Sequence, residues 1–171
     1  MGDRADDPLA DMAVEVTATF DAPIGRVWDL LSDVERMAGL GPEHVAATWA
    51  TTGPAPGARF TGVNRRGDFT WEVPCVITQC RPPEYLEWTV GDAPDHSSTW
   101  SYALSASGTG PTVVVQRFRH GPGFSFVRRR VDGAPDESGA IIAGRSAMLR
   151  DGMAETLAAA ARLLDEDAGT S

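Results

Sequence analysis

One of the three histidines in this sequence stands where proton-transfer chemistry is feasible. His120 ends the alternating run at 112–119 and precedes a flexible Gly-Pro-Gly segment. An imidazole with an ordinary pKa of about 6.5 can donate or accept a proton near neutral pH. No carboxylate partner can be identified for it, so the alternative is a loop histidine bonded to a backbone carbonyl. His44 and His96 fall in polar loops, where we expect them to be solvated.

Three other polar side chains fall on strand positions that should face inward. Asn64 and Gln116 could hold a substrate carbonyl or a water, or could satisfy each other or the backbone. Tyr102 could act as a general acid or donate a hydrogen bond to an enolate, or it could pack in the core with its hydroxyl reaching outward. We predict His120 and Tyr102 as the candidate catalytic residues.

A single arginine and a run of three arginines are candidates for binding negative charge. Arg145 lies on or beside the inward stripe of a predicted helix, where it could pair with a ligand carboxylate or phenolate. Alternatively, its side chain could extend outward to the acidic surface. Arg128–Arg130 lies next to Phe124 and Phe126 and is either a solvated turn or a docking patch for an acidic carrier protein.

Seven short segments with strand character must position these residues. Val, Thr, Phe and Trp alternate with polar residues in most of them, and Gly, Pro and Asp separate them. Most connections are too short for crossovers, so we expect antiparallel pairing. The predicted strands are residues 14–20, 45–52, 58–64, 69–80, 84–90, 97–106 and 112–119.

Helices are predicted at two places. Asp21 and Pro23 mark the start of a short helix after the first strand, and Ser32 with Glu35 forms a capping box for a second. From about residue 135 to 165, apolar residues recur at spacings of three and four, which predicts one long helix. Gly144 and Gly152 inside it indicate a close backbone approach or a gap beside a cavity.

The strand faces predict a cavity. If the turn around Arg66 and Gly67 has two or four residues, even positions before it share a face with odd positions after it. The inward faces then carry many large side chains with polar tips, which a ligand cavity uses more readily than a solid core. Ordinary packing is the alternative for any single tryptophan. The predicted ligand-binding residues are Phe60, Asn64, Phe69, Trp71, Trp88, Trp100, Gln116, Phe118, Arg145, Met148 and Met153. The predicted interior holds no aspartate or glutamate, which argues against paired-carboxylate chemistry.

Composition excludes several functional classes. The formal charge of −9 disfavours nucleic acid and anionic membranes as main partners. All 15 basic residues are arginine, so no lysine can form a Schiff base or bind phosphate in a P-loop. No motif for a metal, a nucleotide or a serine nucleophile is present, and we predict neither cofactor nor metal. No apolar run is long enough for a signal or membrane insertion, which predicts a cytoplasmic protein.

We expect one domain at residues 13–165, between a flexible acidic tail at 1–12 and a C-terminal tail at 166–171. Cys75 and Cys80 lie five apart on one predicted strand, and this odd spacing places them on opposite faces of the sheet. They could not then form a disulfide, and we expect reduced buried thiols.

The order of these segments resembles the START-like, helix-grip (SRPBCC) superfamily. It is most similar to the bacterial polyketide cyclase/dehydratase-like group, whose relatives include the plant pathogenesis-related class-10 proteins. The resemblance covers Val14 to Leu164 and rests on VEVTATFDAPIGRVWDLLSD, PGARFTGVNRRGDFTWEVPCVI, PPEYLEWTV, STWSYAL and the final helix. It implies an α+β helix-grip fold, in which a seven-stranded antiparallel sheet curves around a long C-terminal helix and encloses an apolar cavity.

The resemblance leaves several functions open. Some members are aromatase/cyclases acting on carrier-bound polyketide chains, and others bind or carry lipids, hormones or quinones. They share no catalytic motif, so no site residue is carried over. Our leading hypothesis is a pocket for a hydrophobic, aromatic or polyketide-like small molecule. Catalysis would be a cofactor-free cyclisation or dehydration, with an acyl carrier protein as a potential partner. The alternatives are a carrier or sensor without chemistry, and a protein-interaction module. The connection 121–134 could fold over the cavity mouth.

Overall fold

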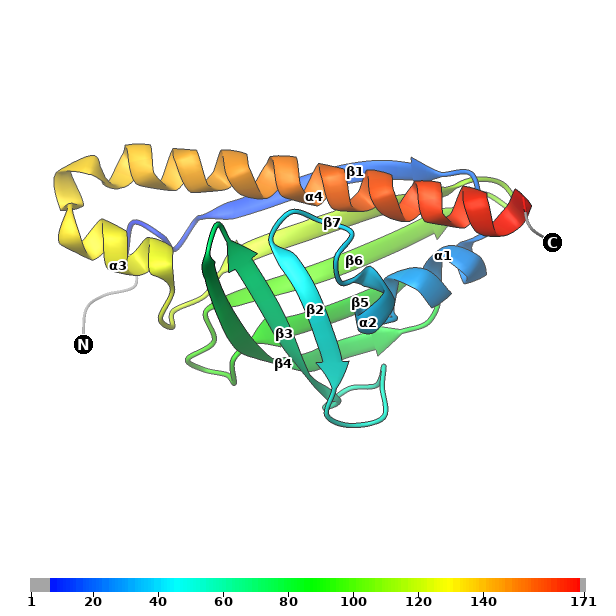
Figure 1. The fold of residues 1–171 in the computed structure, drawn as a ribbon, viewed down its shortest axis with the longest axis horizontal. Helices are drawn as coiled ribbons and strands as arrows, with labels where there is room; N and C mark the ends of the chain where they lie inside the picture. Colours follow the sequence, from blue (N-terminus) through cyan, green and yellow to red (C-terminus); the bar gives the residue numbers. More distant parts are fainter. Residues whose placement is uncertain (1–6, 170–171) are drawn as a thin grey trace.

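The structure, a computed structural model, describes residues 7–169 and has the α+β architecture expected from the sequence. One antiparallel sheet of seven strands curves beneath a long C-terminal helix, α4 (Ser138–Gly169) (Figure 1). The strands are β1 (Ala13–Phe20), β2 (His44–Trp49), β3 (Arg59–Arg66), β4 (Phe69–Arg81), β5 (Tyr85–Val90), β6 (Ser98–Ala106) and β7 (Thr112–His120). All seven strands expected from the alternation are therefore confirmed.

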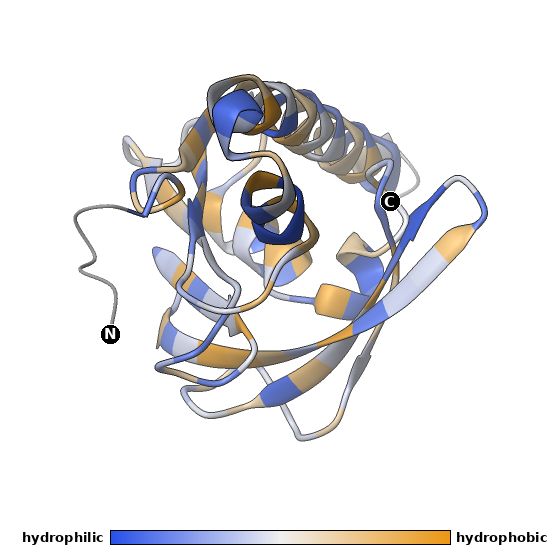
Figure 2. Cartoon of the chain, turned by 90° about the vertical axis from the view of Figure 1, so that its left-hand side faces the viewer, coloured by the Kyte–Doolittle hydropathy of each residue, from blue (hydrophilic) through white to orange (hydrophobic). Residues whose placement is uncertain are grey.

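The strand order places the first and last strands side by side. It runs β1-β7-β6-β5-β4-β3-β2, so β1 and β2 form opposite edges of the sheet. Two short helices, α1 (Ile24–Leu31) and α2 (Val34–Met37), carry the chain from one edge to the other. Viewed from the end where α3 lies, the sheet wraps around the space below α4 (Figure 2).

The caps predicted for the two short helices are wrong. Pro23 is the N-cap of α1 and makes no side-chain hydrogen bond, so Asp21 does not cap it. Asp33 caps α2, because its Oδ1 accepts the backbone N–H groups two and three residues later, at 3.1 Å each. Ser32 instead closes α1 as its C-cap, and the carboxylate of Glu35 accepts a backbone N–H from β2.

The long helix is confirmed and is preceded by a single 3-10 turn at Pro135–Glu137. Its buried face packs mainly along β1 and, at its C-terminal end, against α1. The buried residues of α4 are Ile141, Leu149, Met153, Leu157, Ala160 and Leu164. None of the helices within residues 7–169 is long and apolar enough to cross a membrane.

The connection after β7 contains a helix that the sequence did not predict, α3 (Phe126–Gly133). Ser125 caps it by accepting the backbone N–H of Arg128 at 3.0 Å. The Arg128 guanidinium binds the Asp7 carboxylate at 2.8 and 3.2 Å and donates to two carbonyls of the preceding loop. This network fixes α3 at one end of the sheet.

The N-terminal segment packs on the domain from residue 7 onward. Leu9 and Met12 are buried and belong to the hydrophobic cluster that includes Phe118 and Val131. The folded unit therefore begins earlier than the tail boundary drawn at residue 12, while residues 1–6 lie outside the described residues. At the other end, α4 continues past residue 165 to Gly169.

A bulge changes the expected placement of the cysteines. The register of β4 against β5 shifts between Ile77 and Gln79, and Cys80 then pairs with the buried Leu86. Because the extra residue reverses the alternation, Cys80 lies on the same face as Cys75, and the prediction of opposite faces is wrong. Both thiols are free, and burial raises the pKa of Cys75 to about 12.

Candidate ligand-binding site

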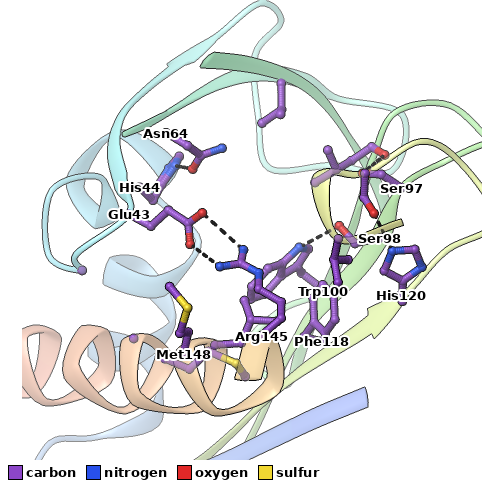
Figure 3. A pocket seen from close by; sticks show the side chains of 18 of the residues that line it. Glu43, His44, Asn64, Ser97, Ser98, Trp100, Phe118, His120, Arg145 and Met148 are labelled. Atoms are coloured by element: carbon purple, nitrogen blue, oxygen red, sulfur yellow. Dashed lines mark hydrogen bonds and ion pairs between the residues drawn. The ribbon is translucent and has the colours of Figure 1, made fainter. Parts of the chain in front are cut away.

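A cavity of about 660 Å³ lies between α4 and the concave face of the sheet and is partly open to solvent. Small-molecule sites commonly fall between about 300 and 1,000 Å³. All the sequence-predicted site residues except Phe69 line it, and Figure 3 labels part of this set. The predicted residues in its wall are Phe60, Asn64, Trp71, Trp88, Trp100, Tyr102, Gln116, Phe118, His120, Arg145, Met148 and Met153. Their roles in binding or catalysis stay predictions.

Cross-strand pairing explains the aromatic floor of the cavity. Trp88, Trp100 and Phe118 are register partners on β5, β6 and β7, so their side chains share the inner face. The two indoles lie nearly parallel, with ring centroids 6.3 Å apart at 8°. Phe118 meets Trp100 edge-on at 4.9 Å. The result is an apolar surface that suits a planar ligand.

The neighbouring row of the floor carries two polar groups. Tyr102 and Gln116 are register partners on β6 and β7, and each is only 5% exposed. The Oε1 atom of Gln116 is buried and has no hydrogen-bond partner among residues 7–169. Burial raises the pKa of the Tyr102 phenol, which therefore stays neutral and can donate a hydrogen bond at pH 7. A donor and an unsatisfied acceptor thus stand together in an apolar wall.

Asn64 has a partner other than the one weighed in the sequence. Its Oδ1 lies 3.3 Å from Nδ1 of His44, and not beside Gln116. His44 begins β2 and places its ring over Gly62, where a Cβ would come within 3.0 Å of the imidazole. Desolvation lowers the pKa of His44, so the expectation of a solvated loop histidine is wrong.

His120 lines the cavity at the end of β7. Its Nε2 lies 2.7 Å from the Oγ of Ser125, a hydroxyl partner that the sequence analysis did not consider. Its Nδ1 is buried without a partner among the described residues. Desolvation, aided by the nearby Arg128 charge, lowers the pKa of His120, which keeps the imidazole neutral and able to accept a proton at pH 7.

A carboxylate that the sequence analysis missed lies at the cavity mouth. Glu43 accepts two hydrogen bonds from Arg145, at 3.0 and 3.2 Å (Figure 3). It accepts a third from Arg66 at 2.7 Å. Glu72 also belongs to the cavity wall. Glu43 therefore adds a carboxylate at the mouth, from a loop that the strand-face argument did not cover, and Arg145 binds it instead of extending to the outer surface.

Glycines bring Glu43 into place. Gly41 has no room for a Cβ because the Thr156 side chain on α4 occupies that space, and Pro42 packs against Gly152. The loop before β2 therefore crosses α4 in close contact, which is one of the two roles predicted for helix glycines. Gly144 shows the other role, since it lines the cavity with no atom near its Cβ position.

Phe69 lies outside the main cavity because it stands at the tip of the β3–β4 hairpin. It is 54% exposed and stacks on Trp71, with ring centroids 5.4 Å apart. Both rings also meet Phe126 edge-on at 5.5 Å. Phe124, Ser125, Phe126, Val127 and Arg130 of the 121–134 connection line one end of the cavity. The sequence did not identify them as site residues because it did not predict α3.

Residues 7–169 contain no group of three or more His, Cys, Asp or Glu side chains that could hold a metal ion.

Comparisons with known proteins agree with this architecture. The family described as polyketide cyclase / dehydrase and lipid transport matches residues 11–161. The solution structure of the Polyketide_cyc-like protein Cgl2372 from Corynebacterium glutamicum is 29% identical, with a TM-score of 0.66 over 91% of this chain and 93% of that protein. No curated protein matches the sequence.

Two more distant structures share the fold alone. A protein from Nitrosomonas europaea is 14% identical, with a TM-score of 0.65 over 96% of this chain and 99% of that one. The di-domain ARO/CYC StfQ from the steffimycin biosynthetic pathway is 13% identical, with a TM-score of 0.68 over 97% of this chain and 55% of StfQ.

Proposed function

Because the chain belongs to the polyketide cyclase / dehydrase and lipid transport family, we propose that its cavity binds a hydrophobic, aromatic or polyketide-like small molecule bearing hydroxyl or carbonyl groups. The observation that carries this proposal is the buried Oε1 of Gln116, which has no partner among the described residues. Leaving such an acceptor unsatisfied costs about 1–3 kcal/mol, which a ligand hydroxyl would recover.

The walls favour a planar oxygenated ligand over a simple aliphatic one. The parallel indoles of Trp88 and Trp100 offer a flat apolar face. Beside them, Gln116 offers an acceptor, and the neutral phenol of Tyr102 offers a donor. An aliphatic chain would cover this row without satisfying either group, whereas a phenolic hydroxyl can donate to Gln116 and a ring carbonyl can accept from Tyr102.

A titration of the purified protein tests this proposal. The probes are a dihydroxyanthraquinone and unsubstituted anthraquinone, and the signal is the fluorescence of the tryptophans in the cavity wall. We expect saturable quenching by both, with tighter binding of the hydroxylated compound. Absence of saturable quenching by either ring system would contradict the proposal.

A second candidate function is cofactor-free cyclisation or dehydration of such a ligand, and the state of His120 favours it. This neutral base lies four residues from Gln116 on β7, about 13 Å away at roughly 3.3 Å per residue. A ligand held at Gln116 and Tyr102 would extend along the strand to the imidazole. Tyr102, Gln116 and Asn64 would polarise carbonyls, and His120 would move the proton from carbon.

Turnover and ligand affinity, measured on the same variant, distinguish the catalytic proposal from the carrier or sensor hypothesis. His120→Ala should abolish turnover of a poly-β-ketone substrate while ligand affinity stays within about threefold, because His120 lies at the far end of the ligand. Unchanged turnover in this variant would overturn the mechanism. Absence of turnover in the unmodified protein, with binding retained, would favour a carrier or sensor.

Docking of a carrier protein and a role as a protein-interaction module both have less support. An acyl carrier protein docking on Arg128–Arg130 would lose one of its three contacts, because Arg128 is already bound to Asp7. A protein-interaction module of this fold would have a closed interior, whereas this chain has a cavity of about 660 Å³.

A further inference from the structure

A second, smaller pocket of about 370 Å³ adjoins the mouth of the main cavity. Its wall consists of arginine and aromatic side chains only: Arg66, Phe69, Trp71, Phe126, Arg129 and Arg130. We call this pocket the annex. Arg66, Trp71, Phe126 and Arg130 also line the main cavity, so the two spaces lie next to each other and share these side chains.

The annex carries positive charge in a strongly acidic protein. The chain has a formal charge of −9, yet the annex wall holds three guanidinium groups and no carboxylate. Arg66 is paired with Glu43 at 2.7 Å. Arg129 and Arg130 are exposed and form no ion pair with any residue in the described part of the chain. Two of the three cationic groups are therefore available to an incoming anion.

The aromatic side of the annex suits the apolar part of a ligand next to its charge. Phe69 and Phe126 are 54% and 40% exposed, and both contact Trp71. The guanidinium carbon of Arg66 lies 5.8 Å from the Trp71 ring centroid, which holds that cation against the ring face. A small hydrated anion would gain little from these rings, and a neutral ligand would leave the positive charge of the arginines uncompensated.

We propose that the annex binds the anionic group, a carboxylate or a phosphate, of a ligand whose apolar body occupies the main cavity. This inference rests on the proposed function. It adds an anionic group to the aromatic, oxygenated ligand proposed there, which makes the ligand an amphipathic anion. Guanidinium groups bind both oxyanions with paired hydrogen bonds. Arg129 and Arg130 would make the first contacts, and Arg66 would add its own when the ligand anion replaces Glu43.

A matched pair of ligands separates the annex from the main cavity. The probes are an anthraquinone carboxylate and the neutral hydroxymethyl anthraquinone of the same ring system, titrated by tryptophan fluorescence. Free acetate, titrated by calorimetry, reports whether the anion is bound without its apolar body. The variant is Arg129→Gln/Arg130→Gln. The control is Arg150→Gln/Arg162→Gln, which removes the same charge from exposed positions of α4 outside both pockets.

We expect the carboxylate to bind about tenfold more tightly than the neutral compound, as two charge-assisted contacts at a partly exposed site would give. Arg129→Gln/Arg130→Gln should remove this preference by weakening binding of the carboxylate about tenfold, and saturable binding of the neutral compound reports that the variant is folded. The control should keep the preference. Raising the salt concentration should weaken binding of the carboxylate alone.

The outcomes that overturn the inference differ from those that overturn the proposed function. Equal affinities for the two anthraquinones, or an unchanged preference in Arg129→Gln/Arg130→Gln, would remove the annex assignment and leave the cavity proposal standing. Acetate binding as tight as the anthraquinone carboxylate would indicate an isolated anion site and would overturn the amphipathic ligand. Failure of both anthraquinones to bind would overturn both proposals.

Discussion

The deep floor of the cavity and its mouth differ in chemistry because different parts of the chain build them. The floor consists of neutral side chains on the central strands, such as Trp100 and Gln116. The mouth consists of charged and exposed side chains on a loop, a hairpin tip and α3, such as Glu43, Arg66 and Phe126. Under the two proposals above, the floor would select a ligand by shape and hydrogen bonds, and the mouth would select it by charge.

The largest expected effect is a loss of stability from the floor. Trp100 stacks with Trp88, contacts Phe118 and donates from Nε1 to Ser98 at 3.1 Å. Trp100→Ala should lower the free energy of unfolding by about 3 kcal/mol, because it removes these contacts and enlarges the cavity. Urea denaturation measures the change. Phe69→Ala is the control from the mouth and should cost about 1 kcal/mol or less, since Phe69 is 54% exposed. Equal losses would refute the division into a structural floor and a binding mouth.

Gln116 in the floor is expected to lower the stability of the protein while it raises the affinity for a hydroxylated ligand. Gln116→Leu replaces an amide whose Oε1 is buried without a described partner. We expect the free energy of unfolding to rise by about 1 kcal/mol, because the desolvation cost disappears. The affinity for the dihydroxyanthraquinone should fall about tenfold, and that for anthraquinone should not fall. A destabilised variant that binds both compounds as before would mean that Gln116 serves the core alone.

Strand alternation made the floor predictable from the sequence, since a period of two assigns each side chain to a face. Trp88, Trp100 and Phe118 were placed correctly because β5, β6 and β7 pair in regular register. The bulge in β4 was not predicted, because an extra residue between Ile77 and Gln79 leaves no mark in the composition. That one residue reversed the assignment of Cys80.

The mouth was not predictable in the same way, since its contacts join segments far apart in the chain. Glu43 and Arg145 are 102 positions apart, and they meet because Gly41 allows its loop to cross α4 beside Thr156. The glycines were visible in the sequence, but their partners were not. The α3 contribution was missed because Phe126–Gly133 carries three arginines in sequence, which resembles a solvated turn.

The two histidines that line the cavity should make the stability of the folded protein depend on pH. Desolvation lowers the pKa of His44 and of His120 in the folded protein. The unfolded chain therefore binds more protons, and stability is fully present above the ordinary histidine pKa of about 6.5 and is lost as pH falls below it. Urea midpoints measured between about pH 7.5 and 5 should fall with pH, and His44→Gln and His120→Gln should each reduce the slope. A slope that neither substitution changes would assign the acid sensitivity to other groups.

The smallest expected effect on stability comes from the mouth, at Glu43. Its ion pairs with Arg66 and Arg145 are partly exposed, so Glu43→Gln should lower the free energy of unfolding by about 1 kcal/mol or less. Removing the carboxylate frees Arg66, and the affinity for the anthraquinone carboxylate should rise about threefold, while that for the hydroxymethyl compound stays unchanged.

Glu15→Gln is the control for Glu43→Gln. It removes an exposed ion pair with Arg117 away from the cavity and should alter neither affinity. A loss of stability as large as that of Trp100→Ala would mean that Glu43 holds the fold together. A gain in affinity confined to the anion would mean that the mouth can be retuned for charge without disturbing the floor.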